Sequence, residues 1–171
     1  MAAKLIHPES RPFAKEASKA LRHYNLPGGF LDRIEREDGI EMVRVRSTTP
    51  IELKDYAAAG RWTLNLEWTI RRDPAGGPIL WRSTIGLSVR DVPFAPEKPV
   101  CLVRYDVDRG RPGPGLGAIG AHLNVFQPDP IRDNLHFPVL AGPGREWAVR
   151  EVLDVLMAPE FVDDISRCLG Q

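Results

Sequence analysis

The sequence has no excess of charge of either sign. Its 171 residues include 23 Lys and Arg and 23 Asp and Glu, so the formal net charge is zero. A protein that grips nucleic acid without sequence preference usually carries an excess of Lys and Arg. Any basic surface here must therefore be local. The arginines form two clusters, Arg104 with Arg109 and Arg111, and Arg71 with Arg72.

Cysteine is scarce, and long apolar runs are absent. Cys101 and Cys168 each lie in an apolar run, which is typical of buried thiols. No run approaches the roughly 18 apolar residues of a membrane span, and residues 1–8 lack the apolar core of a secretory signal. We therefore expect a cytoplasmic protein that makes no membrane contact. We also expect no cofactor.

The length and composition suit one domain with a small helical extension. Apolar residues make up 43% and charged residues 27%, as in ordinary globular proteins. Residues 10–24 have apolar side chains at helical spacing, and residues 30–36 form a second short amphipathic stretch. We assign residues 1–38 to an N-terminal helical arm and residues 39–171 to an α+β core. The apolar face of the arm is thin, which favours a packing or partner-binding role over a helix-turn-helix.

Most of the core has the alternating pattern of β-strands. The clearest strand is residues 61–71, where Trp62, Leu64 and Leu66 share one face with Trp68 and Ile70. Further strands are predicted at residues 40–46, 80–90, 100–107, 119–126 and 135–140. A short helix is predicted from Thr49 to Ala59, because Thr49-Pro50-Ile51-Glu52 has the form of a helix cap.

Two helices are predicted after Gly144, around residues 147–156 and 159–169. Consecutive strands joined by short turns are usually antiparallel neighbours. The prediction is therefore an α+β fold, in which an antiparallel sheet of about five to six strands packs against N- and C-terminal helices.

His122 and His136 are candidates for acid–base chemistry. Imidazole titrates near neutral pH, so one ring can accept the proton of an RNA 2′-hydroxyl while the other protonates the leaving oxygen. The alternative is two unrelated histidines at strand and loop positions. Their spacing is not that of a helical metal pair, and the cysteines lie far away in the sequence, so we expect no metal site.

Arg104 and Asp106 share one face of a predicted strand. Such a pair is suited to hold a phosphate and orient a base, although it is also typical of a solvated cross-strand ion pair. The glycine-rich loop that follows, residues 110–120, lacks the Gly-Lys-Ser/Thr end of a P-loop, and we expect it to connect two strands. Trp62, Trp68, Trp81 and Trp147 are expected in the core, because base stacking would require exposed rings.

The run Leu102-Val103-Arg104-Tyr105-Asp106, with the Arg-Gly loop after it and the closing Phe161-Val162-Asp163-Asp164-Ile165, resembles the TumE-type toxins of bacterial type II toxin–antitoxin systems. The resemblance spans residues 62–169. It implies a toxin that acts on RNA and is neutralised by a cognate antitoxin. The catalytic residues would be His122, His136 and Asp106.

In that interpretation Arg104, Arg109 and Arg111 would bind the substrate. The family's loop usually carries several histidines, whereas this one has none before His122. The alternative function is a non-enzymatic binding module, such as an antitoxin, an immunity protein or an accessory protein, that uses an exposed sheet face. The partners expected are therefore RNA, a cognate antitoxin or other protein, or a second copy of the chain.

Overall fold

The structure is a computed structural model. It describes residues 7–37, 39–57, 60–72, 78–92, 100–108, 120–129, 132–138 and 149–169. The elements are, in order, the 3-10 helix η1 (Pro8–Ser10), α1 (Arg11–His23), β1 (Phe30–Glu37), β2 (Ile40–Ser47), β3 (Ile51–Leu53), β4 (Arg61–Arg72), β5 (Pro78–Arg90), β6 (Val100–Asp108), β7 (Gly120–Asp129), β8 (Arg132–Pro138), α2 (Val149–Leu156) and α3 (Pro159–Leu169).

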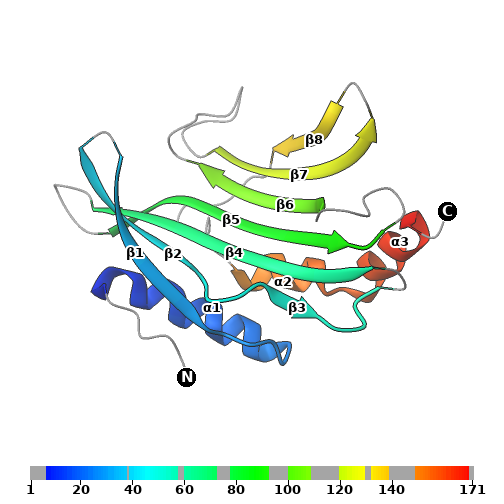
Figure 1. The fold of residues 1–171 in the computed structure, drawn as a ribbon, viewed down its shortest axis with the longest axis horizontal. Coiled ribbons are helices and arrows are strands. Elements are labelled where there is room, and N and C mark those ends of the chain that lie inside the picture. The colour runs from blue at the N-terminus through cyan, green and yellow to red at the C-terminus, as the bar shows by residue number, and fades with distance from the viewer. Residues whose placement is uncertain are drawn as a thin grey trace.

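All eight strands belong to one antiparallel sheet (Figure 1). The strand order is β1-β2-β4-β5-β6-β7-β8, and β3 pairs with β4 on the same side as β2. β2 pairs with residues 67–71 of β4, whereas β3 pairs with residues 62–64. The predicted α+β class, with an antiparallel sheet and terminal helices, is confirmed. The six predicted strands correspond to β2 and β4–β8.

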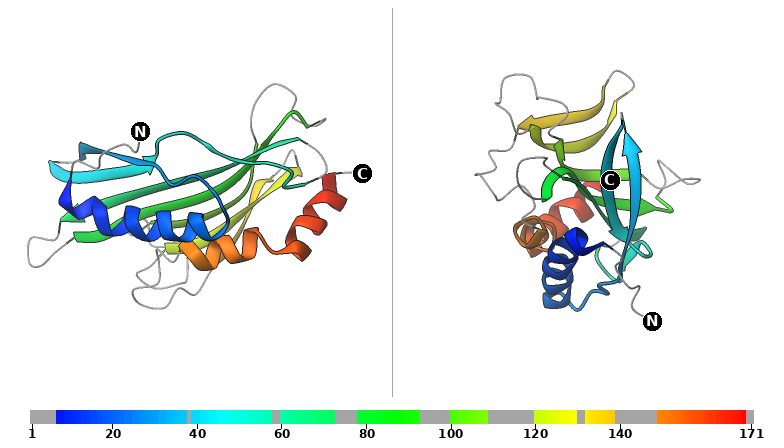
Figure 2. Two further views of the ribbon diagram at one scale, coloured as in Figure 1. Left: turned by 90° about the horizontal axis from the view of Figure 1, so that it is seen from below. Right: turned by 90° about the vertical axis from the view of Figure 1, so that its left-hand side faces the viewer.

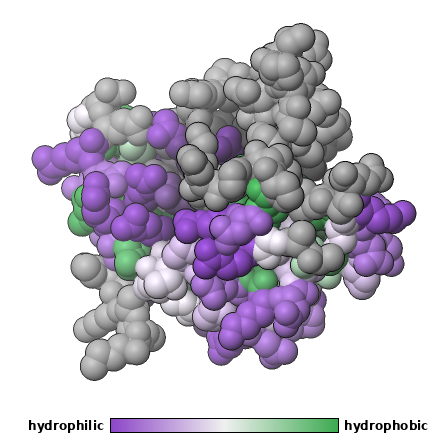
Figure 3. Space-filling model, turned by 45° about the vertical axis from the view of Figure 1, so that its right-hand side comes forward, coloured by the Kyte–Doolittle hydropathy of each residue, from purple (hydrophilic) through white to green (hydrophobic). Residues whose placement is uncertain are grey.

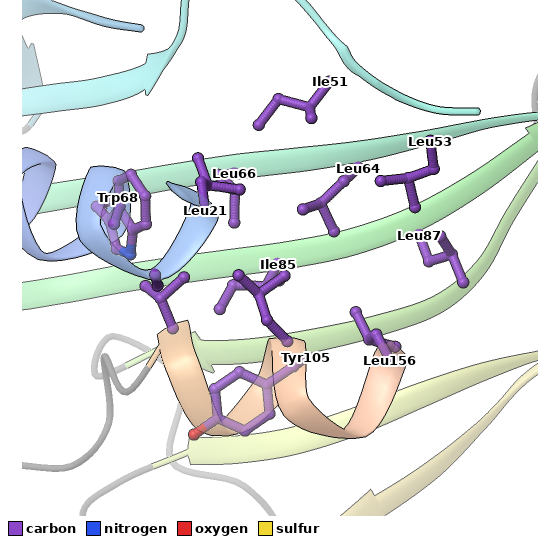
Figure 4. Close-up of a cluster of buried hydrophobic side chains, with 14 of the residues drawn as sticks. Leu21, Ile51, Leu53, Leu64, Leu66, Trp68, Ile85, Leu87, Tyr105 and Leu156 are labelled. Atoms are coloured by element: carbon purple, nitrogen blue, oxygen red, sulfur yellow. The ribbon is translucent and has the colours of Figure 1, made fainter. Parts of the chain in front are cut away.

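The helices form a second layer on one face of the sheet, and the sheet curves over them (Figure 2). Alternate residues of β4 point into the space between the layers, as the two-residue period requires. Leu21 of α1 and Leu156 of α2 belong to one buried cluster with Leu66 of β4 and Ile85 of β5, and Tyr105 joins this cluster from β6 (Figure 4). Trp62 and Trp68 are buried in this core, as predicted.

Two segments predicted to be helical contain strands instead. Residues 30–36 form most of β1, which pairs with β2 over its whole length, and Thr49–Ala59 contains β3. In such short segments the apolar positions fit both periods: Phe30 and Ile34 are one helical turn apart and also on one face of a strand. Because the second helix does not exist, residues 30–36 form no helix-turn-helix with α1.

The N-terminal segment is tied to the sheet by hydrogen bonds. The buried Asp32 of β1 accepts hydrogen bonds from the Ser10 hydroxyl and from the backbone N–H of His7, the latter at 2.9 Å. Since β1 also pairs with β2, residues 7–37 share both the sheet and the core with the rest of the chain.

Polar contacts also join α1 to α2. The Tyr24 hydroxyl donates to Asp154, and Arg150 Nε donates to the same carboxylate oxygen at 2.6 Å. The Arg150 guanidinium lies 5.6 Å from the centre of the Tyr24 ring. The Tyr24 hydrogen bond and then Arg150 lower the pKa of Asp154. Nearby, the buried Tyr56 hydroxyl donates to the Leu156 carbonyl, and burial raises the pKa of Tyr56.

Candidate active site

The face of the sheet away from the helices is polar, and we call it the outer face. Figure 3 shows part of the molecular surface, and the described residues visible there are mostly hydrophilic. On the three central strands the outer face includes Thr63, Asn65, Glu67, Thr69 and Arg71 of β4, Arg82, Thr84, Gly86 and Ser88 of β5, and Arg104 and Asp106 of β6.

Arg104, Asp106 and Thr84 form a compact polar group on this face. Arg104 Nε donates to Asp106 Oδ2 at 2.6 Å, and the Thr84 hydroxyl donates to Asp106 Oδ1 at 2.8 Å. The Arg104 side chain is 47% exposed, but that of Asp106 is only 12% exposed. A carboxylate with a donor on each oxygen is fixed in orientation. Asp106 is therefore better ordered than one half of a solvated surface ion pair.

Gly86 makes room for this group. It lies opposite Arg104 in the β5–β6 register. A Cβ at this position would lie 3.7 Å from Arg104 Cγ and 3.3 Å from Cys101 Sγ. Both side chains thus pack against the bare backbone of β5, which is a common reason for a glycine inside a strand.

Cys101 is half-buried beside this group. Desolvation by burial raises the pKa of its thiol, outweighing the opposing effects of Ser88 and Arg104. Since the thiolate is the nucleophilic form, this thiol is poorly suited to covalent catalysis. Cys101 is therefore a packing residue on the outer face.

The strand register brings both predicted histidines to positions near Arg104 and Asp106. Asp106 pairs with His122 across β6 and β7, while Arg104 pairs with Asn124, which in turn pairs with His136 of β8. Residues that pair directly in an antiparallel sheet belong to the same face, and their Cα atoms lie about 5 Å apart. Arg104 and His136, two strands apart, are thus separated by about 10 Å between Cα atoms.

The side chains of both histidines lie outside the described part of the structure. Arg109 and Arg111, predicted to bind substrate, lie outside it entirely, as do most of the predicted loop at residues 110–120 and Trp147. Their proposed roles stay predictions. What the structure provides is the register, with the four positions 104, 106, 122 and 136 in two neighbouring rows of one face.

An open groove of about 1240 Å³ adjoins these rows. It lies beside the start of β4 and the end of β5 and reaches Asn65 and Ser88, which are joined by a 3.3 Å hydrogen bond. Asn65 belongs to the row of Arg104, because both pair with Gly86. Other polar residues that line the groove are Glu52, Lys54, Arg61 and Arg90. The groove also borders residues 24–27, which follow α1, so it extends from the end of that helix to Asn65 on the outer face.

Sequence reasoning missed Thr84 and Gly86. The available signal was the run Thr84-Ile85-Gly86-Leu87-Ser88, in which small residues alternate with apolar ones. Such alternation puts only small side chains on one face of the strand, which leaves room there for side chains from the neighbouring strands.

Among the residues that the structure describes, no group of three or more His, Cys, Asp and Glu side chains is placed to hold a metal ion. No described helix is long and apolar enough to cross a membrane. No family model, curated protein or solved structure matches this chain.

Proposed function

We propose that this protein is a toxin-type ribonuclease that cleaves RNA by metal-independent acid–base chemistry on the outer face of β6–β8. The observation that carries the proposal is the register: it sets the two histidine positions beside an oriented Arg104–Asp106 pair. The Arg-Tyr-Asp strand and its resemblance to TumE-type toxins support the same function.

Each residue has a distinct role in the proposed reaction. A guanidinium carries five N–H donors, and the contact with Asp106 uses the one on Nε, so Arg104 has further donors for the phosphate. Asp106 orients Arg104 through the 2.6 Å contact, and its position pairs with that of His122 across β6 and β7.

The two histidines divide the proton transfers. One removes the 2′-hydroxyl proton as the 2′-oxygen attacks phosphorus, and the other protonates the 5′-oxygen as the phosphorus–oxygen bond breaks. The products are a 2′,3′-cyclic phosphate and a free 5′-hydroxyl. Arg109 and Arg111 complete the phosphate contacts in this proposal, which places the protein in the cytoplasm with a cognate antitoxin as partner.

The test is cell growth and RNA integrity with matched variants. Induced expression should arrest growth, and Arg104→Gln or His122→Ala should relieve the arrest. The control is Arg33→Gln, which should leave the arrest unchanged. It removes an arginine that is 73% exposed on β1, the edge strand at the opposite end of the strand order from β8. Harmless induction, together with intact RNA after incubation with purified protein, would overturn the proposal.

A specific observation favours the alternative, a protein-binding module. Opposite charges alternate on the outer face of β1, β2 and β4, where Arg44 contacts Glu67 at 2.6 Å and Glu35 at 3.6 Å. A surface of balanced charge is better suited to a protein than to RNA, whose phosphates require a positive surface. This function predicts a stable complex with the product of a neighbouring gene or with a second copy of the chain. A pull-down and a mass measurement that show only monomer would count against it.

A further inference from the structure

A β-bulge places a tryptophan on the outer face. Between β4 and β5 the register shifts, so that Thr69 pairs with Arg82 but Ile70 pairs with Leu80. Trp81 is therefore the extra residue on β5. Bulges commonly redirect a side chain near a functional site. Trp81 is only partly buried, unlike Trp62 and Trp68 in the core.

The redirected ring stacks with an arginine. The guanidinium carbon of Arg71 lies 4.7 Å from the centre of the Trp81 ring. Arg71 follows the core residue Ile70 on β4 and so belongs to the outer face. In the described part of the chain, Arg71 has no carboxylate partner, and its described contact is with this ring.

The stacked pair lies close to the proposed catalytic group. Trp81 precedes Arg82, and Thr84 follows two residues later with its hydroxyl on Asp106. The distance from Trp81 to Thr84 along β5 is roughly 10 Å at the rise of an extended strand. That is within reach of a nucleotide adjoining a phosphate bound at Arg104.

We propose that Arg71 and Trp81 form a base-stacking subsite for single-stranded RNA beside the phosphate that is cut. Unstacked bases stack on aromatic rings and on the planes of arginine guanidinium groups. Both kinds of surface occur here, since Trp81 and Arg71 are each partly exposed on the outer face. The inference rests on the proposed function, because it names the part of the substrate that the same face binds. It requires unpaired bases, so duplex RNA should bind less tightly.

The probe is a fluorescein-labelled single-stranded RNA of about 12 nucleotides, within the usual range of such sites. Its 2′-hydroxyls are methylated, so that it binds but cannot be cut. Fluorescence anisotropy should show Trp81→Ala binding about 5- to 150-fold more weakly, as expected for the loss of one stacked base. Trp81→Phe keeps a ring and should stay within about 3-fold of the parent.

Ile34→Ala is the matched control, because it shortens an apolar side chain that is 51% exposed on the edge strand β1, away from β5, and removes no ring. It should bind like the parent. If Trp81 had only a structural role, Trp81→Ala would lower the melting temperature but leave the dissociation constant of the folded variant for RNA unchanged. If Trp81→Ala does not fold, Arg71→Gln decides, with an expected loss of about 2- to 30-fold.

The outcomes separate this inference from the proposed function. If unmodified RNA is cleaved but Trp81→Ala and Arg71→Gln bind like the parent, the stacking subsite is wrong and the ribonuclease stands. If RNA binds through Trp81 but is never cleaved, the subsite stands and the ribonuclease is wrong. If single-stranded RNA does not bind, or duplex RNA binds as tightly, the subsite is wrong.

Discussion

Replacing Arg104 should destabilise the protein more than replacing Asp106. Arg104→Gln removes the guanidinium that contacts Asp106 at 2.6 Å, whereas the Asp106 side chain, only 12% exposed, keeps its charge and the hydrogen bond from the Thr84 hydroxyl. Asp106→Asn leaves a guanidinium that is 47% exposed and already hydrated, while the asparagine oxygen still accepts from Thr84. Removing the partner of a shielded charge costs more than removing the partner of a hydrated one.

The expected magnitudes follow from this exposure. Breaking a fully buried pair costs about 3–5 kcal/mol, and an exposed pair is worth about 0.2–1 kcal/mol. The Arg104–Asp106 pair lies between these limits. We expect Arg104→Gln to lower the free energy of unfolding by about 2 kcal/mol and Asp106→Asn by about 1 kcal/mol or less.

The assay is urea unfolding of the parent, both single variants and the double variant, at neutral pH. The double-mutant cycle should give a coupling free energy of about 1–1.5 kcal/mol that persists in 1 M salt, since partly buried pairs are screened less than exposed ones. A coupling below about 0.3 kcal/mol, which is the value of a solvated surface pair, would contradict this prediction. So would a larger cost for Asp106→Asn than for Arg104→Gln.

Two further predictions concern stability. Gly60→Ala should lower the free energy of unfolding by about 2–4 kcal/mol in urea unfolding, because Gly60 has φ +81° and a Cβ there would lie 2.5 Å from Val89 Cγ2. Gly39→Ala, at φ +78° with nothing near the new Cβ, should cost only about 1 kcal/mol, and equal losses would show that the clash at residue 60 is not real. Asp154→Asn should flatten the acid dependence of the melting temperature, because the Tyr24 hydrogen bond lowers the folded-state pKa of Asp154 below its ordinary value of 3.8. The stability that this carboxylate contributes is present above pH 3.8 and is lost as the pH falls through its folded-state pKa. If the melting temperatures of variant and parent fall by the same amount between about pH 5 and pH 2, this prediction is wrong.

The long strands and the helices could be predicted from the sequence because each carries several repeats of its apolar period. The twelve residues of β4 and the thirteen of β5 leave no ambiguity between a period of two and a period of 3.6. β1 and β3 could not be recognised in this way. Their apolar residues are too few to distinguish the periods, and tertiary pairing with β2 and β4 decides their conformation.

The candidate site was predictable only in part. The shared face of Arg104 and Asp106 follows from their spacing on one strand, and the structure shows their contact. The pairing of His122 with Asp106 depends on the register between strands separated by a long connection, which no local pattern specifies. The bulge that exposes Trp81 depends on the register in the same way, which is why a core position was expected for this ring.

If the outer face cleaves RNA without a metal, as proposed, the RNA products carry characteristic ends. Purified protein is incubated with single-stranded RNA in the presence of EDTA, and the products are analysed by mass spectrometry. We predict fragments ending in a 2′,3′-cyclic phosphate, formed at a rate that falls about 100-fold or more in His122→Ala. Intact RNA would rule out the proposed reaction, and so would cleavage that requires a divalent cation or that is unchanged in His122→Ala.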